Sequence, residues 1–428
     1  MSATTRGAGW GLLAALTFLN ILNFADRYLL IAFSTAIVPE LKLTNFEFGL
    51  LTGVVFTVVY TCVGLFAGSF ADRFHRPRLI AAGLALWSGL TAATGLAQNF
   101  LTMALPRMLI GVGEACLTPS SMSLLAERFP AARRALAAGV YYMGYPLGIG
   151  GSFIFAGIVG PTLGWRGGFI LLGLVGIAAA LLVFLLVRDP QREHRAGALP
   201  RAVHSMADSF RGIGSELRTN RAFVLTLAGS TVFCFALGAG ILDLLWWVRE
   251  RGYAPVEAQK LLGLIFLVGG CVGAFVGGAG GDWAQRHGPG GRLKFLAGAI
   301  LFTAPLVAGY RLVADHTVLF VFCAFVSSIV IMLLFGPAMS AVQEQVPAHH
   351  RASAVALLLL CTALVGGAFG NAAVGWLADF CTTAGMAQPL TLAVLAVQSV
   401  GLISVPLFYL AAQAQNRAQF AATMIAHA

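Results

Sequence analysis

Charged residues are scarce in this chain. Only 10% of its 428 residues are Asp, Glu, Lys or Arg, whereas soluble domains carry about 25%. Hydrophobic residues make up 58% of the chain, and the mean hydropathy is +0.84. This imbalance excludes an ordinary soluble globular protein. Together with 51 glycines, it predicts a polytopic helical membrane protein.

The chain also lacks the short motifs of common catalytic sites. It contains no GxxxxGK[ST] phosphate-binding loop, which argues against a nucleotide-driven pump, and no GxSxG nucleophile elbow. The seven cysteines are scattered through apolar stretches without a CxxC pair, and no His, Cys or acidic cluster has metal-ligand spacing. We therefore expect no enzyme, no cofactor and no metal site.

The net charge of +10 raises the possibility of a nucleic-acid partner. The basic residues, however, are confined to loops between apolar runs, as the positive-inside rule expects of a membrane protein. We therefore expect membrane lipids, and no nucleic acid, to contact the protein.

Long apolar runs are what the sequence has in abundance. Breaking them at charged or Pro/Gly-rich stretches predicts an all-α membrane protein with twelve transmembrane helices, here called spans 1 to 12. The expected limits of the spans are 10–38, 46–70, 78–97, 100–127, 133–160, 166–187, 221–250, 257–280, 293–313, 317–345, 351–379 and 386–412.

Loop charges predict the orientation of the spans. Arginines gather in the loops after spans 2, 4, 6 and 8, whereas the alternate loops hold few basic residues and several acids. Because basic loops stay on the cytoplasmic side, both termini are expected in the cytoplasm. The composition is rich in Arg and poor in Lys, which favours a bacterial source. We expect an integral protein of the inner (plasma) membrane, present as a monomer.

The sequence repeats itself once. GSFADRFHR at 68–76 is echoed by GAGGDWAQR at 278–286, and ERFPAARRALAA at 127–138 is echoed by EQVPAHHRASAV at 344–355. An offset of about 210 residues predicts two parallel six-helix halves, an arrangement found in many secondary transporters.

A polar linker is expected between the halves. The predicted domains are a first six-helix bundle at 1–187, a cytoplasmic linker at 188–220 and a second six-helix bundle at 221–428. Apolar residues of the linker recur at intervals of three and four, which predicts an amphipathic helix on the cytoplasmic face. These apolar residues are Val203, Met206, Phe210, Ile213 and Leu217.

Four charged residues interrupt spans 1 and 4. NFADRYLL places Asp26 and Arg27 in span 1, and Arg107 and Glu114 share one face of span 4. Because each charge at the bilayer centre costs about 2.5–3.5 kcal/mol on insertion scales, we expect the four to cluster and to be functional. In that interpretation Asp26 and Glu114 bind and release protons, while Arg27 and Arg107 hold an anionic head group. The alternative is a static packing network.

The repeated loop motifs predict a gate on the cytoplasmic side. We expect Asp72 to pair with Arg351, and Asp282 to pair with Arg133 or Arg134, across the two halves. Such pairs would close the cavity on this side when it opens outward, and would break when it opens inward. The expected gate residues are Asp72, Arg73, Arg133, Arg134, Asp282, Arg286 and Arg351.

Further polar and aromatic residues are candidates for the cavity wall. Asp243 is the exception in a second half with few buried charges, and it can face either the cavity or the outer surface. The candidate cavity residues are Asn23, Tyr60, Tyr141, Tyr145, Asp243, Trp246, Phe335 and Asn371. We assign the glycines at 144–151 and 366–370 to rocking at the interface between the halves, with ordinary close packing as the alternative. A polar first half facing an apolar second half would suit a lipid or small amphipathic substrate.

The loop GSFADRFHRPR at 68–78 resembles the signature of the major facilitator superfamily, although His75 stands where that family usually has Gly. The second copy around Asp282 strengthens the resemblance, which covers all twelve spans. Within the superfamily, four stretches resemble the Spinster branch. They are NFADRYLL, RMLIGVGEA at 107–115, GYPLGIGGS at 144–152 and GWRGGF at 164–169.

The resemblance implies a major facilitator fold that transports by alternating access, as a rocker switch. It also implies lysophospholipids or sphingoid lipids as substrates, the proton as coupling ion, and Asp26 and Glu114 as the proton sites. Two alternatives stay open. One is a proton-coupled exporter or symporter of small organic anions or drugs on the same fold, and the other is a membrane receptor that keeps the fold without cycling.

Overall fold

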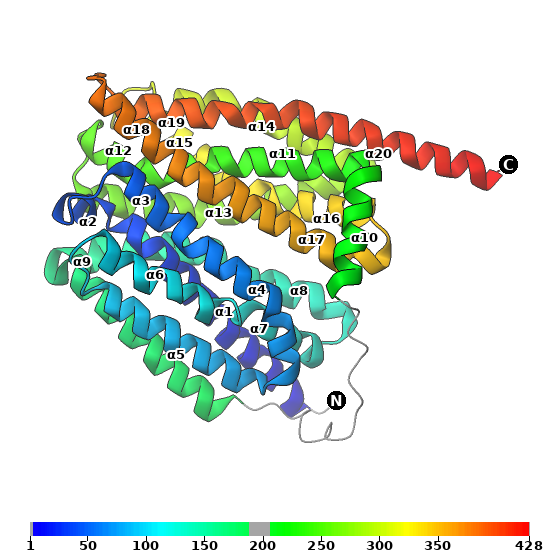
Figure 1. Ribbon diagram of the computed structural model, residues 1–428, viewed down its shortest axis with the longest axis horizontal. Coiled ribbons are helices and arrows are strands. Elements are labelled where there is room, and N and C mark those ends of the chain that lie inside the picture. The colour runs from blue at the N-terminus through cyan, green and yellow to red at the C-terminus, as the bar shows by residue number, and fades with distance from the viewer. Residues whose placement is uncertain (1–2, 188–205, 428) are drawn as a thin grey trace. The chain divides into compact units, whose positions relative to one another are not determined.

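The computed structural model describes residues 3–187 and 206–427, and every regular element in these ranges is helical (Figure 1). Ten described stretches are long and apolar enough to cross a membrane. One of them, 136–186, is 51 residues long and holds both span 5 and span 6. Span 3, which is not among the ten, is the 19-residue helix α5 (Arg76–Thr94). Each of the twelve expected spans is therefore helical.

Most spans of the first half are built from two helices that meet at a break. Span 1 breaks at Phe33, and spans 5 and 6 are separate helical segments joined at Gly164, where the backbone is not helical and φ is 66°. The helices are α1 (Ala3–Ala32), α2 (Ser34–Glu40), α3 (Asn45–Thr52), α4 (Val54–Arg73), α5 (Arg76–Thr94), α6 (Phe100–Glu114), α7 (Leu117–Arg128), α8 (Ala131–Tyr142) and α9 (Gly144–Leu186).

The linker and the second half follow the same pattern of broken spans. Span 7 passes through a 3₁₀ turn at Gly238–Leu242, and span 11 through a π-helical stretch at Cys361–Ala368. The helices are α10 (Met206–Thr219), α11 (Arg221–Leu237), α12 (Asp243–Arg249), α13 (Pro255–Arg286), α14 (Gly291–Gly309), α15 (Val318–Leu333), α16 (Phe335–Gln345), α17 (Arg351–Leu360), α18 (Phe369–Thr383), α19 (Pro389–Val400) and α20 (Ser404–His427).

Side-chain caps fix where several helices begin. The Thr44 hydroxyl accepts a hydrogen bond from the Glu47 amide at 3.0 Å, and the Glu47 carboxylate accepts one from the Thr44 amide at 2.9 Å. This reciprocal pair is a capping box, which satisfies amides that the helix itself leaves free. Asn99 forms a second capping box with Thr102 at the start of α6, and the side-chain oxygen of Asn220 caps α11 by accepting from the Phe223 amide.

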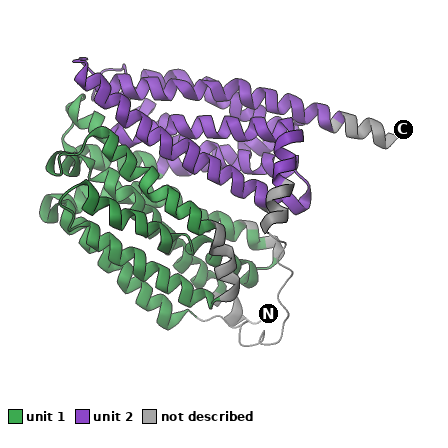
Figure 2. Cartoon of the chain, viewed as in Figure 1, with its two compact units in different colours: residues 1–199, 244–267 green, residues 200–243, 268–428 purple. Residues whose placement is uncertain are grey.

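The chain divides into two compact units (Figure 2). Unit 1 consists of residues 1–199 and 244–267, and unit 2 of residues 200–243 and 268–428. Each has its own apolar core, formed in unit 1 around Leu84, Trp87 and Ile110 and in unit 2 around Phe223, Leu296 and Phe408. The domain limits predicted from the sequence, 1–187, 188–220 and 221–428, stay predictions.

The linker helix is α10, within unit 2. Ile213 is buried in the core of that unit, whereas Leu217 is exposed. Val203 lies outside the described residues, as do the side chains of Met206 and Phe210. The end of α10 lies beside the loop before α17, where the carboxylate of Glu216 is 3.5 Å from Nδ1 of His350.

Glycines bring helices into backbone contact inside each unit. A Cβ at Gly148 would lie 2.7 Å from the carbonyl oxygen of Ile21 in α1, and a Cβ at Gly370 would lie 2.2 Å from that of Phe235 in α11. Neither position has room for a side chain. At these two glycines the close packing is internal to a unit, as the ordinary-packing alternative expected.

Candidate functional site

The four expected charges of spans 1 and 4 come together inside unit 1. Asp26 and Glu114 are each 2% exposed, and Arg107 is 1% exposed. The crossing of α5 and α6 beside them is tight, because a Cβ at Gly113 would lie 2.6 Å from the carbonyl oxygen of Gly83. Glycine at both positions therefore lets the helix that carries Glu114 pack closely against its neighbour.

Glu114 is bound by Arg27. The Nε and Nη2 atoms of Arg27 both lie 2.7 Å from the same carboxylate oxygen, Oε2. The Arg27 side chain is 21% exposed, whereas that of Glu114 is 0% exposed. The pair therefore has a buried acid and a cation that stays partly accessible.

Aromatic rings surround the guanidinium of Arg27. Its Cζ atom lies 4.5 Å from the ring centroids of both Phe56 and Tyr60, and 5.1 Å from that of Phe24. A guanidinium at these distances is attracted by the ring faces. Tyr60 was expected at the site, whereas the two phenylalanines were missed. Their spacing was the available signal, because Phe56 and Tyr60 are one helical turn apart and Phe24 precedes Arg27 by three residues.

Asp26 is bound by the neighbouring helix. Its Oδ2 atom accepts a hydrogen bond from the Thr91 hydroxyl of α5. Among the described residues, its Oδ1 atom has no hydrogen-bond partner. This second oxygen is therefore available to take up a proton or to bind water.

Arg107 contacts the backbone of α1. Its Nη1 and Nη2 atoms donate to the carbonyl oxygens of Asp26 and Arg27, at 3.3 and 3.2 Å. These bonds fix α1 at the point where it carries its charges. Arg107 thus takes part in the cluster as a positioning residue, whereas Arg27 is the cation with an accessible side chain.

A second buried ion pair lies in unit 2. Arg311 follows α14 and donates to the carboxylate of Asp243, with side-chain exposures of 0% for the arginine and 16% for the aspartate. Sequence reasoning had noted Asp243 alone. The available signal for Arg311 was a basic residue at the end of span 9 where the positive-inside rule expects few.

The remaining cavity candidates differ in burial. Tyr141 and Trp246 are fully buried, Asn23 is 4% exposed, and Tyr60, Tyr145, Phe335 and Asn371 are half-buried. Tyr145 lies beside α1, where its hydroxyl is 3.4 Å from that of Tyr28.

Each repeat has an ion pair between an arginine in the first turn of its third span and the glutamate of the second repeated stretch, although the two arginines do not align in the repeat. Arg76, in the first turn of α5, lies 2.7 Å from Glu127 of the ERFP stretch. In the second repeat Arg292, in the first turn of α14, contacts Glu344 of the EQVP stretch. Arg292 also lies 2.7 Å from Asp282. Sequence reasoning missed these pairs, although the repeat of the two stretches was visible.

The expected gate residues are in part outside the described structure. The side chains of Asp72 and Arg73 lie outside the described residues. The others, Arg133, Arg134, Asp282, Arg286 and Arg351, are exposed. Arg134 donates to the carbonyl oxygen of Phe129 at 3.1 Å. The pairing of Asp282 with Arg133 or Arg134 across the halves stays a prediction, since Asp282 is bound here by Arg292.

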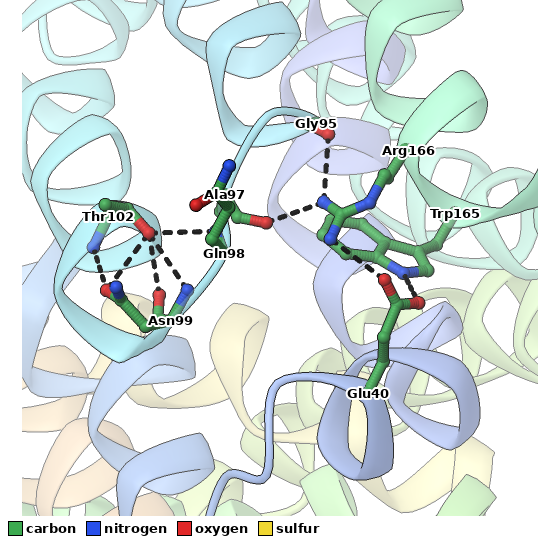
Figure 3. Close-up of polar contacts among 8 residues, drawn as sticks. All are labelled: Glu40, Gly95, Ala97, Gln98, Asn99, Thr102, Trp165 and Arg166. Carbon is green, nitrogen blue, oxygen red and sulfur yellow. Dashed lines mark hydrogen bonds and ion pairs between the residues drawn. The ribbon is translucent and has the colours of Figure 1, made fainter.

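The GWRGGF stretch ties three segments of unit 1 together (Figure 3). The Glu40 carboxylate, at the end of α2, accepts hydrogen bonds from Nε1 of Trp165 at 2.6 Å and from Nη2 of Arg166 at 2.9 Å. Arg166 also donates to the carbonyl oxygens of Gly95 and Ala97 in the loop before α6. The bend at Gly164 presents the Trp-Arg pair to this loop and to α2.

The sequence of the chain is similar to those of known proteins. The family model described as Major Facilitator Superfamily matches residues 16–371. The chain is 28% identical over 400 residues to an MFS-type efflux pump of Mycolicibacterium smegmatis, covering 92% of this chain and 91% of the pump. It is 25% identical to the sphingosine-1-phosphate transporter SPNS2 of Danio rerio, covering 85% of this chain and 75% of that protein.

The fold is also similar to solved structures. A bacterial homolog to the human lysosomal transporter Spinster, in an inward-facing and unoccupied conformation, has a TM-score of 0.83 at 22% identity, covering 97% of this chain and 98% of the other. Among further Spinster relatives are several of which the chain spans about half the length. The expected helical transporter fold and its resemblance to Spinster proteins are confirmed.

Proposed function

Because the chain belongs to the Major Facilitator Superfamily, whose members are transporters rather than enzymes, we propose that it is a proton-coupled transporter of lysophospholipids or sphingoid-type lipids. It works by alternating access, with Asp26 and Glu114 as the proton sites. The coupling ion is the proton, and the transporter acts as a monomer in a bacterial inner membrane with both termini in the cytoplasm.

The Arg27–Glu114 pair is the observation that carries this proposal. A guanidinium held by two hydrogen bonds to an ionised carboxylate is bound strongly, and protonation of the carboxylate removes the charge from that bond. Protonation of Glu114 therefore releases Arg27 to bind an anionic head group, and deprotonation recaptures it. Arg27 suits a phosphate because its donors form a planar fork.

Asp26, the residue before Arg27 in α1, supports the same cycle. Its Oδ2 atom is bound by Thr91, and its carbonyl oxygen by Arg107. Two buried carboxylates near each other resist being ionised together, so a proton is readily shared within the cluster. Arg107 keeps α1 in place while that proton moves.

The substrate class rests on the relatives. The Danio rerio relative is named for sphingosine-1-phosphate, a lipid with an anionic phosphate head group. Arg27 is partly exposed and is surrounded by aromatic rings, so it provides both charge and apolar surface for a lipid of this kind. The efflux pump of Mycolicibacterium smegmatis favours a second candidate, the export of small organic anions or drugs by the same cluster.

The test is transport by purified protein in liposomes with an imposed pH gradient. Wild type is expected to move labelled lysophospholipid or labelled sphingosine-1-phosphate, with a rate that depends on the gradient. Asp26→Asn and Glu114→Gln are each expected to remove that dependence. Glu47→Gln is the matched control, because Gln also completes a capping box and Glu47 lies outside the cluster.

Each result decides between the candidates. Lipid transport with normal dependence on the gradient in Asp26→Asn and in Glu114→Gln would contradict the proton sites. No lipid transport by wild type under any gradient would contradict the lipid substrate, and the same liposomes would then be tested with small organic anions and drugs.

A further inference from the structure

The break in span 1 leaves a buried backbone carbonyl that helix geometry does not satisfy. In an unbroken helix the amide of Ala36 would donate to the carbonyl oxygen of Ala32. Here the Ala36 amide donates to the carbonyl oxygen of Phe33 at 3.0 Å. Ala32 is 0% exposed, so water does not supply a donor. A buried carbonyl in this position needs a partner from elsewhere in the fold.

Gln259 of α13 is that partner. Its Nε2 atom donates to the carbonyl oxygen of Ala32 at 2.7 Å, across 227 residues of sequence. Gln259 is 5% exposed. The hydrogen bond therefore joins span 1 of the first half to span 8, which comes from the second half of the sequence but whose first part lies in unit 1.

The backbone of α13 crosses α9 beside this bond. A Cβ at Gly150 would lie 2.6 Å from the carbonyl oxygen of Gly263, and a Cβ at Gly263 would lie 2.9 Å from that of Gly150. About two turns further along α9, a Cβ at Gly157 would lie 3.4 Å from the Cβ of Gln259. The two helices are therefore in backbone contact, and the Gln259 amide is held close to α1 by this crossing.

The same α1 carries the charge cluster. Ala32 follows Asp26 by six residues, which is about 9 Å along a helix. The carbonyl oxygens of Asp26 and Arg27 are bound by Arg107, and that of Ala32 by Gln259. A movement of α1 that accompanies proton uptake would therefore also move the Ala32 carbonyl relative to Gln259.

We propose that Gln259 couples the charge cluster to closure of the far end of span 1, which is the outer end in the predicted orientation. While the Gln259 amide holds the Ala32 carbonyl and α13 lies against α9, the outer side is closed. Outward opening breaks this hydrogen bond and separates the glycine crossing. Gln259 is a positioning residue of the transport cycle, and its role rests on the proposed proton-coupled function.

The test measures outer opening directly. Spin labels are attached at Leu96 and Met386, which are exposed in the loops between spans 3 and 4 and between spans 11 and 12, in a background without native cysteines. The full chain is placed in lipid nanodiscs, and the distance distribution is recorded with wild-type Gln259 and with Gln259→Met. Met keeps the length of the side chain and removes the donor. The ratio of open to closed populations is expected to rise roughly tenfold, the effect of leaving one buried carbonyl unsatisfied.

Two matched controls separate the coupling from general damage. Gln415→Met removes a buried amide of unit 2 and is expected to leave the ratio unchanged. Gly150→Ala is expected to favour opening because its Cβ would collide with α13, whereas the neighbouring Gly151→Ala, which meets nothing within 4 Å, is expected to be neutral. This glycine pair tests the crossing even if Gln259→Met folds poorly.

A double-mutant cycle tests the coupling itself. Asp26→Asn is expected to shift the outer distances in the wild-type background and to shift them several-fold less in Gln259→Met. Additive effects would overturn the coupling, and unchanged distances in both Gln259→Met and Gly150→Ala would overturn the closure. Because no substrate is present, these outcomes are independent of whether the protein moves lipids.

Discussion

Arg27 and Glu114 come from different helices and are 87 residues apart, yet two guanidinium nitrogens of Arg27 converge on one oxygen of Glu114. The guanidinium leaves the second carboxylate oxygen, Oε1, unused. A proton can therefore add to Glu114 without first displacing Arg27. In the proposed cycle this geometry would allow a stepwise path, with protonation first and release of the arginine second.

Arg27→Lys is expected to impair transport although it keeps the charge. Lysine cannot place two donors on one oxygen in a fixed plane, and it loses the stacking on Phe56 and Tyr60. We expect the initial rate in liposomes to fall about tenfold, corresponding to about 1.4 kcal/mol. The exposed Arg286→Lys serves as control. An unchanged rate in Arg27→Lys would show that only the charge matters.

The ion pair of Asp243 and Arg311 is expected to matter mainly for stability. Asp243→Asn leaves the fully buried Arg311 side chain with a neutral partner, and removing one member of a buried pair costs about 3–5 kcal/mol. We expect a clear fall in melting temperature in detergent. The double variant Asp243→Asn with Arg311→Gln should recover part of it. A melting temperature equal to that of wild type in Asp243→Asn would contradict this assignment.

The ion pairs of the two repeats are expected to contribute modestly to stability, and Arg292 more than Arg76 because it also contacts Asp282. Arg76→Gln and Arg292→Gln each break a contact with a glutamate. Because these pairs are partly exposed, each is expected to contribute about 0.5–1 kcal/mol. The swap Arg76→Glu with Glu127→Arg should restore stability in thermal unfolding. Failure of the swap while Arg76→Gln is destabilised would point to a role beyond charge pairing.

The Glu40 contacts are expected to hold the end of α2. Glu40→Gln keeps an oxygen that accepts from Trp165 but loses the charge that attracts Arg166, whereas Glu40→Ala loses both. We expect Glu40→Ala to lower stability by about 1 kcal/mol and Glu40→Gln to lower it by less. Hydrogen exchange of residues 34–40 measures the effect locally. Equal protection in all three proteins would exclude this role.

Much of the fold could be predicted because membrane-spanning helices are recognisable in a sequence by their length and apolar composition. The spans, the repeat and the clustering of Asp26 with Glu114 all depend on the cost of unpaired charge and exposed backbone in lipid. The breaks inside spans were not predictable in the same way. A break at Phe33 or a 3₁₀ turn at Gly238–Leu242 depends on a partner helix, such as the one that supplies Gln259 to Ala32.

The sequence also did not show which of several chemically similar residues would contact a given partner. The sequence offered several arginines for Asp282, and the nearby Arg292 binds it because the loop returns α14 to the end of α13. Arg311 was hidden by its place at a helix end, where a basic residue ordinarily faces water or head groups. Only the packing of α14 shows that it is buried against Asp243.

The π-helical stretch at Cys361–Ala368 has a consequence for the evolution of span 11. A π-helical turn accommodates about one residue more than an α-helical turn while keeping the phase of the helix beyond it. The stretch therefore corresponds to an α-helix into which one extra residue has been inserted. Loss of one residue within it would leave Gly370 facing Phe235, whereas loss of one residue just after it would rotate the rest of α18 by about 100° against everything that precedes it. Length changes in this span are thus tolerated at one turn and excluded at the next.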